Sequence, residues 1–186
     1  MKNKIIWITG FVDSGKTTIA KALQKKIEDS KYTSVVVLDA VELRRFVSFD
    51  LGYTNKDRKL NVLRAGGIAK ILHDQGITVI VALISPCRAD RVEVRKMFDE
   101  GDFIEVHNNT PIEVCAKRDT KGLYKTQKNP KFLDRIFRPS WFSLPGSKSS
   151  YEPPLNPEIV IDTSKSKIDQ CVEYIYKKIY SNKKSK

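Results

Sequence analysis

The sequence predicts a three-layer α/β/α sandwich built on a mainly parallel β-sheet. Short β-branched runs alternate along the chain with longer amphipathic segments, and this alternation is typical of right-handed βαβ units. Two of the short runs, VVVL at residues 35–38 and VIVAL at residues 79–83, are apolar throughout. Strands of this kind are buried on both faces, as they are when helices cover both sides of a parallel sheet.

The elements follow from these patterns in chain order. Strands are predicted at residues 5–9, 34–38, 78–83, 102–107 and 158–161. Helices are predicted at residues 17–29, 57–75, 89–98, 111–117 and 167–180, with a short helical turn at residues 41–46. A chain of 186 residues with 40% hydrophobic side chains is near the usual size of one domain, so we expect a single domain over residues 1–186.

Residues 119–157 interrupt the alternation, because they are rich in Lys, Pro, Ser and aromatic side chains and show little periodicity. A long irregular segment inside a compact domain is usually functional or disordered. We predict a lid that orders over a ligand, and the alternative is a partly disordered insertion. The basic tail at residues 181–186 is expected to fray.

The composition narrows the class of partner. The net charge is +12, but the lysines are scattered and no basic and aromatic residues interleave as they do in RNA-binding motifs. We therefore expect small polyanionic ligands and no nucleic acid. No apolar run approaches the roughly 20 residues that span a bilayer, and the three cysteines lack disulfide or metal-ligand spacing. A cytoplasmic protein without a membrane partner is the expectation.

The strongest functional signal is GFVDSGKT at residues 10–17, which matches G-x-x-x-x-G-K-[ST] between a predicted strand and a predicted helix. Glycines let the backbone N–H groups turn toward phosphates, and the helix that follows adds its positive dipole end. The fold is therefore predicted to be of the P-loop NTPase type. Lys16 should reach the β- and γ-phosphates of ATP, and Thr17 should bind Mg²⁺. The predicted ATP-binding residues in this region are Gly10, Asp13, Ser14, Gly15, Lys16, Thr17 and Thr18.

Ligands of open α/β sheets gather beyond the carboxyl ends of the strands, which directs attention to Asp39 after the VVVL run. A carboxylate there can position Mg²⁺ or accept the proton of an attacking hydroxyl, and it can also cap the following helix. We predict that Lys16 and Asp39 are catalytic and that Thr17 and Asp39 hold the metal. Arginines in the segments after the second and third strands make an anion-receiving cleft plausible; they are Arg44, Arg58, Arg64, Arg88 and Arg91.

Several ordered motifs resemble the adenylylsulfate (APS) kinase family over residues 6–163. The segment DLGYTNKDR at residues 50–58, followed by Asn61 and Arg64, resembles the family's DLGFS-x-x-DR-x-x-N-x-x-R element. ISPCRADR at residues 84–91 resembles ISPFRADR, and RDTKGLYK at residues 118–125 resembles RDPKGLYK. The runs FIEV, TPIEVC and YEPP at residues 103–106, 110–115 and 151–154 also have counterparts in the family.

This resemblance implies a homodimeric, Mg²⁺-dependent enzyme of sulfate assimilation that transfers the γ-phosphoryl group of ATP to the ribose 3′-hydroxyl of APS. It implies that Lys121 is catalytic and that Arg118 lies near the ATP base or the lid. The implied acceptor-binding residues are Arg44, Tyr53, Arg58, Asn61, Ile84, Ser85, Lys121 and Phe142. Tyr53 stands where the family has a Phe that stacks on adenine, and Phe142 or Trp141 is expected to cover the other adenine face.

The chain departs from the family on the acceptor side. The family's DGD-N-x-R reads DAVELR at residues 39–44, so Val41 replaces the second carboxylate. Leu60 stands in place of Glu, Cys87 in place of an aromatic residue, and residues 132–150 replace a shorter FTGI-type element. Two alternatives follow: the same reaction on another activated nucleotide, such as cytidine diphosphoramidate, and a non-catalytic nucleotide-binding protein.

Overall fold

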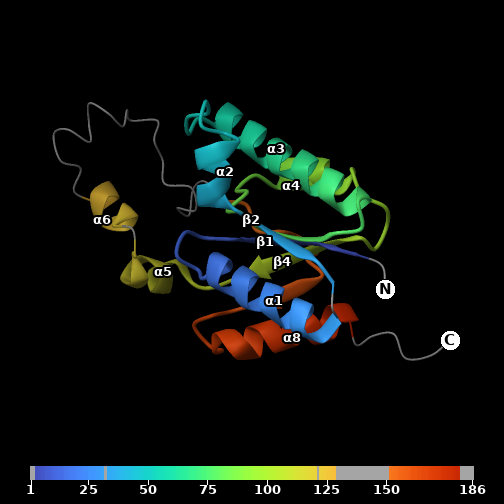
Figure 1. Cartoon of the computed structure of the whole chain (residues 1–186). Coiled ribbons are helices and arrows are strands. Elements are labelled where there is room, and N and C mark those ends of the chain that lie inside the picture. Colours follow the sequence, from blue (N-terminus) through green and yellow to red (C-terminus); the bar gives the residue numbers. More distant parts are fainter. Residues whose placement is uncertain (1–2, 32, 121, 129–150, 181–186) are drawn as a thin grey trace.

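The protein is described from a computed structural model, in which residues 3–31, 33–120, 122–128 and 151–180 are described (Figure 1). Five strands form one sheet in the order β2-β3-β1-β4-β5, and all four neighbouring pairs run parallel. The predicted α/β class and the parallel sheet are therefore confirmed. The strands are β1 Ile5–Gly10, β2 Val35–Asp39, β3 Thr78–Ala82, β4 Phe103–Asn108 and β5 Ile159–Ile161.

Helices cover both faces of the sheet and complete the three layers (Figure 1). Each predicted helix is present, with ends that shift by up to three residues. The helices of the described residues are α1 Lys16–Lys31, α2 Ala40–Phe46, α3 Asn55–Asp74, α4 Arg88–Arg95, α5 Ile112–Arg118, α6 Leu123–Lys128 and α8 Ile168–Tyr180. Among these helices, none is both long and apolar enough to cross a membrane.

The buried central strand β1 divides the core into two halves because successive side chains of a strand point to opposite faces. Ile6 and Ile8 pack with residues of α1 and α8 on one face. Ile5 and Trp7 pack with residues of α3 and α4 on the other. Trp7 is fully buried, as its predicted place in the core requires.

The prediction of an irregular stretch at residues 119–157 needs one correction, because helix α6 lies within it. Asp119 starts this short helix: one carboxylate oxygen accepts from the backbone N–H of Tyr124 and the other from that of Lys125, each at 3.0 Å. The capping is a local polar interaction, so apolar periodicity carries no sign of it. Residues 129–150 and the predicted tail at 181–186 lie outside the described residues.

Helix α3 packs closely on α4 through Gly66. A Cβ atom at Gly66 would lie 2.8 Å from both methyl carbons of Val94, whereas a Cβ at the neighbouring Gly67 would have no atom within 4 Å. Two adjacent glycines of one helix therefore differ in what a methyl group would meet.

We predict that Gly66→Ala destabilises the protein by about 1 kcal/mol, because overpacking costs about 1–3 kcal/mol and outweighs a helix-propensity gain of about 1 kcal/mol. Gly67→Ala is the matched control and should stabilise by up to about 1 kcal/mol. Chemical denaturation of both variants measures the difference. Equal stabilisation by the two substitutions would contradict the packing argument.

Candidate active site

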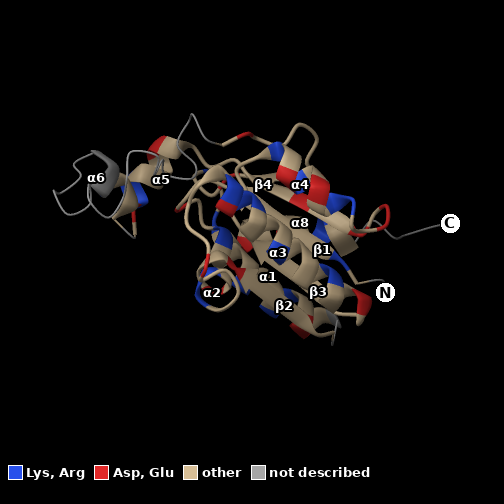
Figure 2. Ribbon diagram, turned by 90° about the horizontal axis from the view of Figure 1, so that it is seen from above, with Lys and Arg blue, Asp and Glu red and all other residues tan. Residues whose placement is uncertain are grey.

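The candidate site lies at the carboxyl end of the sheet, where β1 runs into the P-loop at residues 10–17 and β2 ends at Asp39. Helices α2 and α5 lie toward this end in two views (Figures 1 and 2). Figure 2 also shows basic and acidic residues interspersed over the ribbon. The topology therefore brings the predicted phosphate-binding and metal-binding residues to one edge.

The P-loop needs backbone conformations that favour glycine. Gly10 has φ 154° and Gly15 has φ 93°, both in the left-handed half of conformational space. A Cβ at Gly10 would lie 2.5 Å from the backbone oxygen of Asn108. Asp13 also has a positive φ, 57°, which is uncommon for a residue with a side chain. These turns give the loop the curvature that a phosphate cradle requires.

Thr17 and Asp39 come together as the metal prediction requires. The Thr17 hydroxyl donates to Asp39 Oδ2 at 2.6 Å, while Asp39 Oδ1 accepts from the backbone N–H of Val41 at 2.8 Å. The predicted alternative of helix capping is thus also correct, because the two carboxylate oxygens have different partners. A hydroxyl and a carboxylate in contact are oxygen ligands of the kind that Mg²⁺ takes, so the donor set fits this metal.

The ammonium group of Lys16 lies inside the loop. It donates to the backbone oxygen of Phe11 at 2.5 Å and lies 3.5 Å from the hydroxyl of Ser14. Lys16 and Ser14 are buried, whereas Thr17 and Thr18 are exposed at the start of α1. The predicted ATP-binding residues of the motif therefore form one continuous loop and helix start.

Three polar residues that sequence reasoning missed hold the loop from behind. Asn108 Nδ2 donates to the backbone oxygen of Ser14 at 2.7 Å, and the Thr163 hydroxyl donates to the same oxygen at 2.9 Å. Thr110 joins them, because its hydroxyl donates to Asn108 Oδ1 at 2.7 Å. Asn108 follows a predicted strand and Thr110 opens the TPIEVC run, but neither pattern indicated contacts with the loop, and no pattern marked Thr163.

Arg118 adds a second connection to the loop. Its guanidinium donates to the hydroxyl and the backbone oxygen of Thr163 at 2.7 and 2.9 Å, and to the backbone oxygen of Asp13 at 3.4 Å. Thr120 donates to Asp13 Oδ1 at 2.6 Å. These contacts place Arg118 beside the P-loop, and its position near the ATP base or the lid stays a prediction.

The predicted acceptor residues of α2 and α3 form a cationic group. Arg44 donates to the backbone oxygens of Leu51 and Gly52 at 3.0 and 2.6 Å, and its guanidinium lies 4.6 Å from the centre of the Tyr53 ring. Arg58 donates to the backbone oxygen of Tyr53 at 2.7 Å. Burial lowers the pKa of both guanidinium groups, and the charge of Arg44 further lowers the pKa of Arg58. Two cations held this close favour an anion between or beside them.

Asn61 and the segment at residues 84–85 complete the predicted acceptor residues among those that the structure describes. Asn61 is buried on α3, and its Oδ1 has no hydrogen-bond partner among the described residues. Ser85 has φ 38°, and its hydroxyl accepts from Trp7 Nε1 at 2.9 Å. The backbone oxygen of Ile84 accepts from the Thr9 hydroxyl at 2.6 Å. Lys121 and Phe142, which were also predicted to contact the acceptor, lie outside the described residues.

Two of the residues that depart from the family lie on helices α2 and α3. Val41 is 54% exposed although it is apolar, and Glu42 is exposed beside it. Leu60 lies at the surface of α3. The carboxylate that the family motif would place at position 41 is therefore replaced by an apolar side chain directed to solvent.

His107, one of the two histidines that can be considered as bases, is an unsuitable one. Burial and the nearby charge of Arg91 lower its pKa to about 4, and its ring stacks against Tyr151 at a centroid distance of 6.1 Å. A group that is neutral and packed in this way at pH 7 acts as part of the core.

Together, the sandwich, the P-loop and the Thr17–Asp39 pair define a P-loop kinase. The family described as adenylylsulphate kinase matches residues 2–162. A probable adenylyl-sulfate kinase of Halalkalibacterium halodurans is 39% identical, over the whole of this chain and 87% of the relative. An adenylyl-sulfate kinase of Prochlorococcus marinus is also 39% identical, over 96% of this chain and 84% of the relative.

A solved structure gives the same result. The APS kinase of Mycobacterium tuberculosis in complex with AMPPNP and APS superposes with a TM-score of 0.81 at 34% identity, over 96% of this chain and 98% of that one. The chain belongs to the adenylylsulphate kinase family, whose members are kinases that transfer phosphate to a hydroxyl group.

We predict that Asp39→Asn lowers kcat at least about 100-fold. The amide of Asn is neutral, so the predicted Mg²⁺ site loses the negative charge of the carboxylate. Asn caps a helix about as well as Asp, so the free energy of unfolding should change by less than about 0.5 kcal/mol. Steady-state kinetics at several Mg²⁺ concentrations and thermal unfolding measure the two effects. Loss of both activity and stability would instead assign Asp39 mainly to capping.

Proposed function

We propose that this chain transfers the γ-phosphoryl group of ATP to the ribose 3′-hydroxyl of APS. The observation that carries the proposal is the arrangement at one edge of the sheet. The P-loop and the Thr17–Asp39 pair lie there at the ends of β1 and β2, and the cations Arg44 and Arg58 lie on the next two helices of the chain, α2 and α3. Membership of the adenylylsulphate kinase family supports APS as the acceptor. The similar Mycobacterium tuberculosis enzyme was solved with both an ATP analogue and APS.

On the donor side, the P-loop backbone and Lys16 bind the phosphates of ATP, and the N-terminal end of α1 adds a positive potential. Thr17 and Asp39 would hold Mg²⁺, which when bound would neutralise charge on the phosphate oxygens. Arg118 lies on the ATP side through its contacts with Asp13 and Thr163. These groups place charge, which is the main requirement of a loose phosphoryl-transfer transition state.

On the acceptor side, Arg44 and Arg58 bind the anionic phosphosulfate group, and Tyr53 stacks on the base. Arg44 already lies over the Tyr53 ring, so these two side chains present one surface with an aromatic and a cationic part. In the reaction the 3′-hydroxyl oxygen bonds to the γ-phosphorus, the bond from that phosphorus to the bridging oxygen breaks, and the hydroxyl proton is released. ADP and 3′-phosphorylated APS are the products.

One observation favours a second candidate acceptor. Val41 is exposed beside Asp39, at the position where the family motif has a second carboxylate. A change there, together with Leu60 on α3, alters the acceptor side and leaves the P-loop intact. The alternative is the same reaction on another activated nucleotide, such as cytidine diphosphoramidate.

The test is coupled ATP turnover by the purified chain with Mg²⁺, in which APS is compared with cytidine, uridine and guanosine nucleotide derivatives. We expect saturable turnover of APS with the new phosphate on the ribose 3′ position. The control is Lys16→Ala, which should lose activity at least about 100-fold because the phosphates lose their ammonium partner. Turnover that persists in this control would reveal a contaminating kinase.

Two outcomes would overturn the APS proposal. Turnover of a cytidine derivative but not of APS would retain the kinase and change its acceptor. Absence of turnover with every acceptor, in protein that binds ATP, would favour a non-catalytic nucleotide-binding role.

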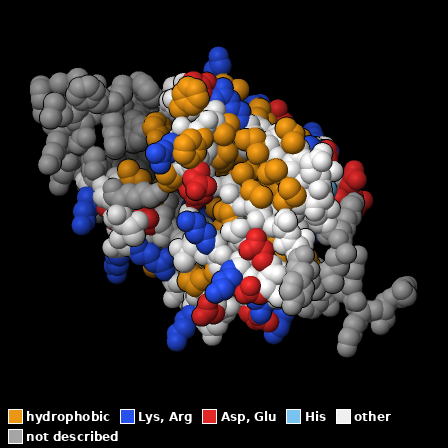
Figure 3. All heavy atoms as spheres, viewed as in Figure 1, with side chains coloured by type: hydrophobic (Ala, Val, Ile, Leu, Met, Phe, Trp, Pro, Cys, Tyr) orange, Lys and Arg blue, Asp and Glu red, His pale blue; other side chains and the backbone are white. Residues whose placement is uncertain are grey.

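We also infer that the chain forms a homodimer, as the resemblance to the family implies. Exposed apolar side chains favour association, and Phe46, Phe49 and Ile71 are 66, 78 and 66% exposed. Figure 3 shows apolar side chains gathered on the face that carries α3. An APS kinase of Thiobacillus denitrificans has been solved as a hexamer, so sedimentation velocity must distinguish the two assemblies.

A further inference from the structure

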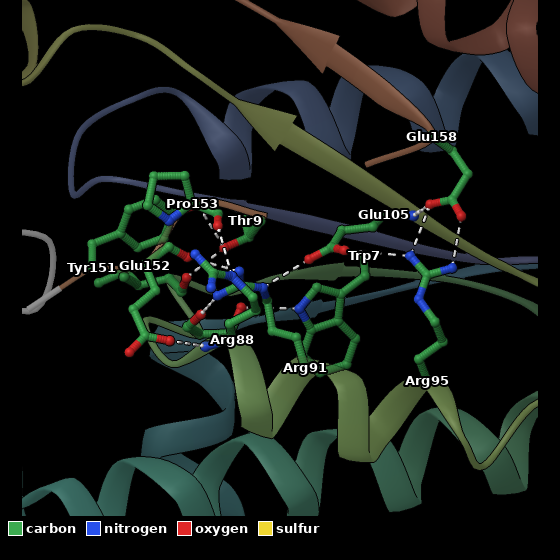
Figure 4. A network of polar contacts seen from close by, with 12 residues as sticks. Trp7, Thr9, Arg88, Arg91, Arg95, Glu105, Tyr151, Glu152, Pro153 and Glu158 are labelled. Carbon is green, nitrogen blue, oxygen red and sulfur yellow. Dashed lines mark hydrogen bonds and ion pairs between the residues drawn. The ribbon is translucent and has the colours of Figure 1, made fainter. Parts of the chain in front are cut away.

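Arg91 of α4 is the centre of a buried polar network that reaches the acceptor side of the site (Figure 4). Arg91 is 1% exposed, and each of its three guanidinium nitrogens donates a hydrogen bond. Nε donates to Glu105 Oε1 at 2.7 Å, Nη1 to the backbone oxygen of Ser85 at 2.6 Å, and Nη2 to the backbone oxygen of Glu152 at 2.7 Å. One side chain thus joins α4, β4, the segment after β3 and the segment that begins at residue 151.

Ser85 needs this support because its backbone is strained. Its φ of 38° is uncommon for a residue with a side chain, and such conformations persist where the surroundings hold them. Arg91 holds the Ser85 backbone oxygen, and Trp7 Nε1 holds the Ser85 hydroxyl at 2.9 Å. One donor holds the backbone of Ser85 and the other holds its side chain, so the residue has little freedom to rotate.

The neighbouring Ile84 is held by a chain of hydroxyl groups with a fixed direction. The Thr9 hydroxyl donates its single proton to the backbone oxygen of Ile84 at 2.6 Å. In its contact with the Tyr151 hydroxyl at 3.1 Å, the Thr9 oxygen must therefore accept a hydrogen bond that Tyr151 donates. Tyr151 accordingly supports Ile84 through Thr9, while Arg91 supports Ser85 directly.

The charge of Arg91 is balanced locally, which allows the guanidinium to be buried. Glu105 supplies the carboxylate, and Arg95 reaches the other oxygen of Glu105 at 3.3 Å. Arg95 also binds Glu158 with two hydrogen bonds of 2.6 and 2.9 Å. Arg95 therefore shares Glu105 with Arg91, but among the described residues it makes no contact with residues 84–85 (Figure 4).

We propose that Arg91 is a positioning residue for the acceptor nucleotide, acting through the backbone of Ile84 and Ser85. This rests on the proposed function and on the resemblance to the family, which implies that Ile84 and Ser85 bind the acceptor. A guanidinium serves this purpose because its planar fork donates in three fixed directions, whereas the ammonium of a lysine donates from one point. Arg91 is buried and its three nitrogens are bound to the protein, so its role here is to position the backbone that faces the acceptor.

The test compares Arg91→Lys with Arg95→Lys in the full chain, with the acceptor that the wild-type enzyme turns over best. Arg91→Lys should raise KM for the acceptor about tenfold, equivalent to about 1.4 kcal/mol, and leave KM for ATP within about twofold. Arg95→Lys is the matched control on the same helix and should leave both KM values within about twofold. Thermal unfolding of both variants shows how much stability each loses.

The outcomes separate a positioning role from a purely structural one. Equal effects of the two variants on acceptor KM, or an effect of Arg91→Lys on kcat alone, would overturn the proposal. If Arg91→Lys does not fold, Thr9→Val provides the second variant, because it keeps Arg91 and removes the donor to Ile84. A severalfold rise in acceptor KM alone is then expected, and an unchanged value would refute the role of this segment.

Failure of this proposal and failure of the proposed function are distinguishable. The wild-type enzyme alone decides whether APS is the acceptor. The ratio between the Arg91 and Arg95 variants decides the positioning role with any nucleotide acceptor that is turned over. If the wild type turns over no acceptor, binding of APS to the three proteins by calorimetry gives the same comparison, and equal affinities would overturn the proposal.

Discussion

The close approach of the P-loop to β4 is the constraint on which the nucleotide-binding end depends. Gly10 pairs with Asn108 at the last register position of β1 and β4, and a Cβ at Gly10 would lie 2.5 Å from the Asn108 oxygen. A glycine is therefore required for these strands to stay paired to their ends. Because they do, the Asn108 amide reaches the backbone oxygen of Ser14 at 2.7 Å. The curvature of the loop is fixed by the sheet itself.

Asp39 connects that loop to helix α2 because its two carboxylate oxygens have different partners. The oxygen that accepts from Val41 fixes the start of α2, and the oxygen that accepts from Thr17 faces the start of α1. Capping at Val41 uses the backbone N–H and leaves the side chain exposed. The side chain at position 41 is therefore free to vary without disturbing the cap, which explains how this chain can lack the family's second carboxylate and still keep the same helix start.

The sequence was sufficient for the parts of the structure that follow from periodicity and local motifs. Buried β-branched runs predicted all five strands, and Gly10, Lys16, Thr17 and Asp39 were placed correctly at one edge because strand ends of a parallel sheet meet there. Side-chain partners between distant segments were not predictable. Thr163 contacts Ser14 across 149 positions of chain, and a threonine after a short strand carries no pattern that indicates such a contact.

The buried ion pair of Arg91 and Glu105 is better explained by geometry than by stability. Desolvation of two charges cancels much of their attraction, so well-packed apolar residues of similar volume are often as stable. Apolar side chains, however, donate no hydrogen bonds to the backbone oxygens of Ser85 and Glu152. Ser85 would then be free to leave its positive φ, and the segment after β3 would lose its present shape. The guanidinium of Arg91 therefore matters for the directions of the hydrogen bonds that it donates, and the carboxylate of Glu105 offsets the cost of burying its charge.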